Sequence, residues 1–258
     1  MKTRSLYFVA ALFTTASLLL ASCAMATPQP TATSAPVLPS ATPKPAATST
    51  ATPKPTVTVT PTITPNATAT QQVELFAAKV KQYQDAGYVS TAAGTYDFLP
   101  NKSSSWAEIG YYNWEKTKFS PTDFIIKSEI TWNSASAAAD SSGCGFVFHI
   151  QDNSDHYMFY VSLKGYIEAA VNVGNRWKSL GRGSFGLAAQ RGNATVTFIA
   201  EGSTFRVLVG DKLIKTYTGL AGKLMTGDLA YTVLSGTNKS YGTSCDFKNT
   251  ELWTIQHK

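Results

Sequence analysis

The sequence has little charge and few reactive side chains: 15% of its 258 residues are charged, and it contains three histidines and three cysteines. No acid precedes Glu74, so all sixteen acids fall in the C-terminal part of the chain. Four of the 22 Lys and Arg residues precede residue 71, which leaves this part with eighteen bases and a net charge near +2. Nucleic-acid binding requires a clustered basic surface, so we expect no nucleic-acid partner.

Motifs for the common hydrolytic chemistries are also missing. The sequence has no Gly-x-Ser-x-Gly elbow, which would position a nucleophilic serine. A glycosidase needs two facing carboxylates, whereas Glu129, Glu168 and Glu251 stand singly among basic, polar or apolar neighbours. Isolated acids on strands usually face solvent. The sequence therefore predicts a protein that is not an enzyme, with a diverged glycoside hydrolase as the less favoured alternative.

Residues 1–22 have the composition of an export signal. Lys2 and Arg4 supply positive charge, and the apolar run over 6–21 is too short for a good membrane span. The run ends in LASC, which resembles the bacterial lipobox, in which the cysteine is lipidated. The alternatives are an ordinary signal peptide cleaved at the following AMA, or a simple membrane anchor. We expect an exported protein that a lipid on Cys23 holds on the outer face of a bacterial membrane.

The segment 23–70 lacks the residues that build a core. Ten of the twelve prolines lie within 27–70, together with two copies of ATPKP and no acid or aromatic residue. Such a composition is typical of an extended, disordered linker. We expect this Pro/Thr-rich linker to hold the folded domain away from the membrane.

The remaining chain changes from helical to strand periodicity. Apolar residues recur at helical spacing in a segment that Gly87 ends, which predicts a short helix over 71–90: Val73, Phe76, Ala77, Val80 and Tyr83. From residue 91 to 258, short alternating segments such as 124–132 are separated by Gly, Asn, Asp and Ser turns. This pattern predicts an all-β domain, an antiparallel β-sandwich.

The order of these segments resembles a known superfamily. GCGFVFHIQDNSDHYMFYVSLKGYIEAAVNVGNRWKSL, over 143–180, is followed by SGTNKSYGTSCDFKNTELW, over 235–253. This order, with Asp-Phe-x-Asn at 246–249, is similar to concanavalin A-like (laminin G-like) jelly rolls, and more closely to a poorly characterised form on exported bacterial lipoproteins. The resemblance covers about residues 90–255 and implies a jelly-roll fold. Because the superfamily includes lectins, glucanases and adhesion domains, it does not select a function.

Cysteine usage fits export. If Cys23 carries a lipid, Cys144 and Cys245 remain, and they can form a disulfide in an oxidising compartment. The alternative is two buried free thiols, because buried cysteine packs like a small apolar residue.

Residues 143–162 contain two histidines, two aspartates and a cysteine. Alternation places Cys144 and Ile150 on one face of a strand and His149 on the other. Residues 151–155 then predict a hairpin loop, since Asp and Asn favour turns. Zinc would require three or four ligands, and the EF-hand pattern is missing. Calcium is the alternative, since laminin G-like domains often hold it through Asp and carbonyl oxygens; the candidate ligands are Asp152, Asn153 and Asp155, and no other cofactor is expected.

Carbohydrate binding requires an exposed aromatic ring and a few polar groups. Trp177 follows a turn beside Asn175 and Arg176, and Tyr157 and Tyr166 lie in neighbouring predicted strands. These residues are the candidate ligand-binding set, with packing of Trp177 on its own hairpin or in the core as the alternative. The other tryptophans are expected in the core: Trp106, Trp114, Trp132 and Trp253. We therefore expect a cell-surface binding domain for carbohydrate or polysaccharide; the alternative is a structural or protein-adhesion domain.

Overall fold

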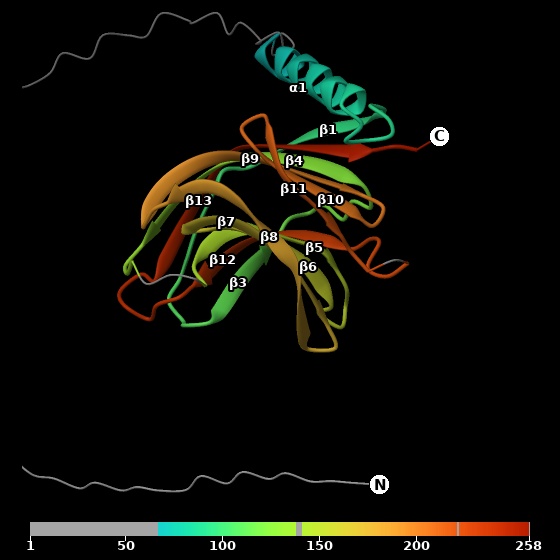
Figure 1. Ribbon diagram of the computed structural model, residues 1–258. Helices are drawn as coiled ribbons and strands as arrows, with labels where there is room; N and C mark the ends of the chain where they lie inside the picture. Colours follow the sequence, from blue (N-terminus) through green and yellow to red (C-terminus); the bar gives the residue numbers. More distant parts are fainter. Residues whose placement is uncertain (1–66, 138–140, 221, 258) are drawn as a thin grey trace, which may run out of the picture. The chain divides into compact units, whose positions relative to one another are not determined.

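The computed structural model describes residues 67–137, 141–220 and 222–257. The predicted signal peptide (1–22), the lipidation site Cys23 and the predicted linker up to residue 66 lie outside these residues. The described residues form one helix and thirteen strands (Figure 1). No helix among them combines the length and apolar character needed to cross a membrane.

The strands form two antiparallel sheets, which confirms the predicted jelly-roll β-sandwich. Sheet A has the order β1 (Gly94–Leu99), β13 (Thr243–Ile255), β4 (Phe124–Ser134), β9 (Arg191–Glu201), β10 (Thr204–Val209) and β11 (Lys212–Thr218). Strand β2 (Lys102–Trp106) also pairs with β13. Sheet B has the order β3 (Tyr111–Lys116), β12 (Asp228–Ser235), β5 (Gly143–Ile150), β6 (His156–Ser162), β7 (Lys164–Val173) and β8 (Arg176–Ala188).

Aromatic rings from both sheets fill the space between them. Phe159 of β6 stacks on Phe198 of β9 with 4.0 Å between ring centroids. Phe146 of β5 lies 5.5 Å from Phe247 of β13. Trp132 is 1% exposed and also belongs to this core, as predicted. Because these contacts join residues far apart in sequence, the inner faces of the sheets fix each other's position.

The predicted disulfide joins the two sheets through this core. Cys144 of β5 and Cys245 of β13 are bonded, with 5.7 Å between their Cα atoms and 101 residues between them in sequence. Both cysteines are fully buried. The pairing expected from compartment and cysteine count is therefore confirmed, and the alternative of two free thiols is excluded for this structure.

Helix α1 (Ala67–Asp85) covers the outer face of sheet A (Figure 1). It begins four residues before, and ends five residues before, the predicted bounds of 71 and 90. Three of the residues predicted to face the protein are buried against the sheet: Phe76, Val80 and Tyr83. Their partners include Trp253 and Ile199. Trp253 is therefore buried under the helix rather than between the sheets, because its strand has the helix on its outer face.

Sheet B is apolar on both faces at its centre, and it curls. Strands β5 and β6 are buried at every position, although only one of their faces meets sheet A. A Cβ atom on Gly145 would lie 2.0 Å from the Phe159 carbonyl oxygen, so only glycine allows the close approach of β5 and β6 there. Edge strands of a flat six-stranded sheet lie about 24 Å apart at ~4.8 Å per strand. Here rings from both edge strands meet: those of Tyr112 (β3) and Trp177 (β8) are 5.4 Å apart.

The expected alternation in β5 fails at its end. His149 has a φ of 52°, and the pairing of β5 with β12 shifts register beside it. Ile150 therefore packs with Val147 and Met158 on the outer face of sheet B, whereas simple alternation placed it with Cys144. The buried His149 ring lies between two backbone carbonyls: Nδ1 is 2.6 Å from the Leu224 oxygen and Nε2 is 2.8 Å from the Thr122 oxygen. Through these two contacts, His149 holds the end of β5 against the loops that contain Thr122 and Leu224.

The disulfide should contribute strongly to stability. Removing it in the double variant Cys144→Ala and Cys245→Ala should lower the free energy of unfolding by about 4–5 kcal/mol, because a closed loop of about 100 residues restricts the unfolded chain. Urea denaturation of the wild type, with and without reductant, and of the variant measures this difference. Equal unfolding free energies in oxidised and reduced protein would contradict it.

Packing of the helix can be tested with two adjacent residues. Phe76→Ala should lower the free energy of unfolding by about 3–5 kcal/mol, because Phe76 is 2% exposed against sheet A. Leu75→Ala is the control and should change it by less than about 0.5 kcal/mol, since Leu75 is 64% exposed. Chemical denaturation measures both, and similar effects of the two variants would show that the helix is not docked on the sheet.

Candidate ligand-binding face

Four ring side chains gather on the outer face of sheet B, the face away from sheet A. They are Tyr112 and Trp114 from β3, His156 from β6 and Trp177 from β8, and we call them the outer-face cluster. The His156 ring lies 4.6 Å from Trp114 and 5.3 Å from Trp177, measured between centroids. Tyr112 contacts the three other rings at 5.4 to 5.9 Å. These side chains come from both edges of the sheet and cover part of its apolar outer face.

Hydrogen bonds order the cluster. His156 Nδ1 lies 2.6 Å from the Ser154 carbonyl oxygen, so it donates the hydrogen bond, and Nε2 accepts from the Tyr112 hydroxyl at 3.2 Å. Burial lowers the pKa of His156 below its usual value, which favours this neutral form. Burial also raises the pKa of Tyr112, while a hydrogen bond from Asn172 lowers it in part. Both side chains are therefore neutral at physiological pH.

Asn172 adds a buried polar group next to the cluster. It lies on β7, paired across the sheet with His156 on one side and Trp177 on the other. The residue is 9% exposed, and its Oδ1 atom has no hydrogen-bond partner within the described part of the chain. A buried acceptor without a partner costs free energy, so this amide has unused capacity to bind a polar group.

A hollow of about 290 Å³ lies beside the cluster. We call it the outer-face hollow, and its lining includes Tyr112, Trp177, Glu168 and Ser179. Trp177 is 46% exposed, which is unusual for so large an apolar side chain. The rest of the lining is small or apolar apart from Tyr160: Gly110, Met158, Tyr160, Ala169, Ala170 and Leu234. The hollow thus combines exposed aromatic surface with a carboxylate and a hydroxyl.

The outer face continues along β7 and β8 beyond this hollow. Arg182 lies opposite Glu168 in the ladder, and its guanidinium lies over the Tyr166 ring at 4.9 Å. Tyr166 is six residues from Asn172 on the same strand, a separation of about 20 Å at ~3.3 Å per residue. A long, partly exposed face with an aromatic ring near each end results.

The structure divides the residues that the sequence suggested for ligand binding. Trp177 is exposed, so the alternative of core packing is excluded for the described structure. Tyr166 shares its face but lies at the other end. Asn175 has a φ of 59° in the two-residue turn between β7 and β8, where its role is to form the turn. Arg176 pairs with Val173, which packs towards the core, so alternation directs it to the face opposite Trp177.

Tyr157 requires a correction. It is 1% exposed and lies between the sheets, where its ring contacts Phe148 and Phe205. Its hydroxyl accepts a hydrogen bond from the Leu220 amide at 2.7 Å. The expectation failed because the first residue of β6, His156, takes the outer face, which turns Tyr157 inward. Tyr157 therefore cannot contribute to a surface site.

Most of the outer-face cluster was not predicted from the sequence. Tyr112 and His156 were given no ligand role, and Trp114 was expected in the core, whereas it is half-buried on the outer face. The strand over 111–116 was not predicted, and its pairing with β12 spans more than a hundred residues. The density of aromatic residues in YYNW, over 111–114, is the one local sign that could have pointed to this strand.

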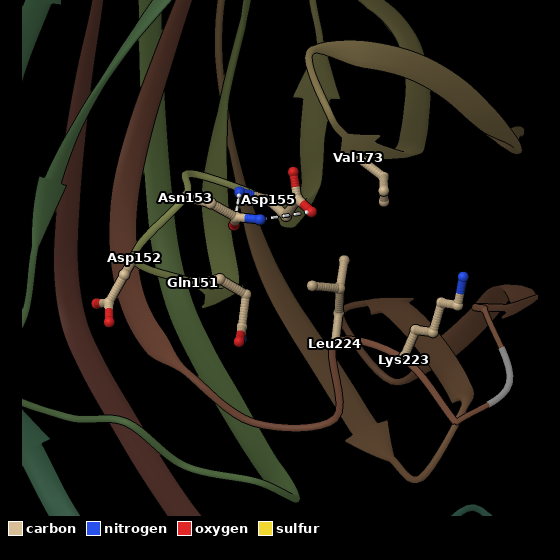
Figure 2. Close-up of a pocket in the computed structure, with 7 residues that line it drawn as sticks. All are labelled: Gln151, Asp152, Asn153, Asp155, Val173, Lys223 and Leu224. Carbon is tan, nitrogen blue, oxygen red and sulfur yellow. Dashed lines mark hydrogen bonds between the residues drawn. The ribbon is translucent and has the colours of Figure 1, made fainter.

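The loop between β5 and β6 forms a second hollow, of about 530 Å³, at the end of the sandwich (Figure 2). The loop is the predicted hairpin turn: Asn153 Oδ1 accepts from the Asp155 amide at 3.0 Å. Asp155 also accepts from the Gly174 amide at 2.7 Å, which joins this loop to the turn between β7 and β8. Figure 2 shows the Asp152 side chain pointing away from the other two.

Calcium at this loop stays a prediction. The candidate ligands Asn153 and Asp155 are already engaged with each other and with backbone amides, and Asp152 does not converge with them. Among the described residues, no group of three or more His, Cys, Asp or Glu side chains is arranged to hold a metal ion. The hydrogen bonds in the loop are those of a turn.

Comparisons with known proteins find similarity in fold. No protein-family model and no curated protein matches the sequence. The carbohydrate-binding module CBM66 from Bacillus subtilis is 11% identical with a TM-score of 0.45, over 60% of this chain and 94% of that chain. Aspergillus kawachii β-fructofuranosidase is 11% identical with a TM-score of 0.45, over 64% of this chain and 28% of that enzyme. Bacillus licheniformis β-glucanase is 12% identical with a TM-score of 0.39, over 56% and 71%.

The neutral state of His156 predicts a dependence of stability on pH. Because burial lowers its folded pKa below 6.5, the unfolded chain binds more protons in acid. The contribution of neutral His156 to the free energy of unfolding is fully present above the pKa of this histidine in the unfolded chain. It is lost as pH falls through the pKa of His156 in the folded protein. The free energy of unfolding should therefore decrease from about pH 7.5 to about pH 5, and less steeply in His156→Gln. Urea denaturation across this range tests it, and identical pH slopes would contradict it.

Proposed function

We propose that this protein is an exported, lipid-anchored β-sandwich that binds carbohydrate, such as a cell-surface polysaccharide, on the outer face of sheet B. The observation that carries the proposal is the half-exposed Trp177 ring at the edge of the outer-face hollow, with Glu168 and Ser179 in the same lining. A sugar ring has apolar faces that stack on aromatic rings and a rim of hydroxyls that bind carboxylates, hydroxyls and amides. Both kinds of group are present in the hollow.

The dimensions of the outer face favour a polymer over a single sugar. Trp177 and Tyr166 lie on the same face about 20 Å apart, at ~3.3 Å per residue along β7. Between them the face carries polar and charged groups at Ser179, Glu168 and Arg182. An extended chain of several sugar units is long enough to contact both rings, which is why polysaccharide is the proposed ligand class.

Binding without hydrolysis is the proposed activity. Glycoside hydrolysis needs two carboxyl groups on either side of the scissile bond, about 5 Å apart for retention and farther for inversion. Glu168 is the one carboxylate among the residues that line the outer-face hollow. Glu115 of β3 is engaged with Lys102, and Asp228 of β12 with Lys116. A single carboxylate suits recognition of hydroxyl groups better than acid–base catalysis.

The proposed location rests on the sequence pattern of residues 1–70. A lipid on Cys23 would make the membrane a partner, and the Pro/Thr-rich linker would place the domain away from it. The Cys144–Cys245 disulfide supports export, because disulfides persist in oxidising compartments. Display outside the membrane would give the outer face access to extracellular or periplasmic glycans.

Trp177→Ala should weaken polysaccharide binding about tenfold or more, since loss of aromatic stacking costs on the order of 1.4 kcal/mol. Native gels containing immobilised polysaccharides measure the retardation of the wild type and the variant. Tyr241→Ala is the control, because Tyr241 is 38% exposed in the loop between β12 and β13, outside the hollow lining. Equal retardation of wild type and Trp177→Ala would exclude this site, and absence of binding to any polysaccharide would favour a structural or adhesion role.

A further inference from the structure

The outer-face hollow has an unbalanced charge. Among its lining residues Glu168 is the one with a carboxyl side chain, and none is Lys, Arg or His. Glu168 is partly buried on β7, and it forms no ion pair within the described part of the chain. A partly desolvated carboxylate without a counter-ion attracts a cation and repels an anion. The hollow therefore distinguishes ligands by the sign of their charge.

The nearest basic residue in the ladder does not neutralise Glu168. Arg182 is its register partner on β8, at a distance that would allow an ion pair. The Arg182 guanidinium instead lies over the Tyr166 ring, 4.9 Å from its centroid. Arg182, on the edge strand β8, thus directs its guanidinium away from the hollow, and the Glu168 carboxylate remains available to a ligand.

The aromatic lining also favours a cation. The rings of Tyr112 and Trp177 meet at 82° with centroids 5.4 Å apart, so they form a corner of two nearly perpendicular π systems. Tyr160 contributes a third ring to the lining. Aromatic faces attract ammonium groups within about 6 Å, and most strongly where water is excluded. Aromatic rings around one carboxylate are the arrangement that recognises an ammonium group.

Building on the proposed function, we infer that the outer-face hollow selects glycans that carry a free ammonium group, such as polymers of de-N-acetylated hexosamine. The apolar face of the sugar stacks on Trp177, and the ammonium group pairs with Glu168 and lies against the aromatic rings. An N-acetylated sugar of the same size has no charge to pair with Glu168. An acidic glycan would place its negative charge beside the Glu168 carboxylate, and the two would repel each other. The amine is therefore the feature that distinguishes the preferred ligand.

The test compares three oligosaccharide series of equal length and linkage that differ only at C2: chito-oligosaccharides with free amines, their N-acetylated forms, and cello-oligosaccharides with a hydroxyl. Isothermal titration with the oxidised protein should show at least about tenfold tighter binding of the amine series, as expected for a charge-assisted pair. The preference should disappear as pH rises through the pKa of the sugar amine.

Two variants identify the carboxylate. Glu168→Gln keeps the shape of the side chain and should reduce binding of the amine series about tenfold while leaving the acetylated and hydroxyl series unchanged. Glu129→Gln, an exposed carboxylate on β4 of sheet A, should leave all three series unchanged. Unchanged melting temperatures of both variants show that the fold is intact.

The outcomes separate this inference from the proposed function. Equal or tighter binding of the acetylated or hydroxyl series by the wild type would overturn selection for an ammonium group, while glycan binding itself would stand. A preference for amines that survives in Glu168→Gln would also overturn it, because another group would then supply the charge. If none of the three series binds, the inference fails, and the polysaccharide gels with Trp177→Ala decide the proposed function independently.

Discussion

The structure depends on one constraint: strands β5 and β6 carry buried side chains on both faces, and a two-layer sandwich covers only one of them. The inner face is covered by sheet A, where Phe159 stacks on Phe198. The outer face is covered by the curl of sheet B, which brings Tyr112 and Trp177 together from opposite edges. At Gly145 the pairing of β5 and β6 leaves no room for a side chain, because any Cβ atom there would collide with the neighbouring strand.

The position of the candidate site follows from the way in which the curl of sheet B covers its own outer face. A curled sheet with apolar residues at its centre and large rings on its edge strands encloses space, and the outer-face hollow is the part that the rings leave open. The same rings therefore stabilise the fold and offer a surface to a ligand. His156 is at the centre of these rings: it is buried against Trp114 and Trp177, and it is hydrogen-bonded to Tyr112.

Particular residues show how far the sequence predicted the fold and the site. The helical spacing of Phe76, Val80 and Tyr83 and the pairing of the two core cysteines were predicted and are confirmed. Alternation failed where the strand is irregular, at His149, whose positive φ moves Ile150 to the outer face. Tyr157 was chosen because its predicted strand is close in sequence, with no face assigned to it, and it is buried. Adjacency to Trp177 in sequence did not place Arg176 beside it.

The class of fold, the helix, the turn at 151–155 and the disulfide could be predicted from the sequence, because each depends on local periodicity, turn chemistry or a count of cysteines. The residues that make up the candidate site, by contrast, come together only in the folded protein. Tyr112, His156, Glu168 and Trp177 lie on four different strands, and the contacts among them depend on ladder register and on the curl of sheet B. Those are properties of the paired strands together, and no short segment of the sequence encodes them.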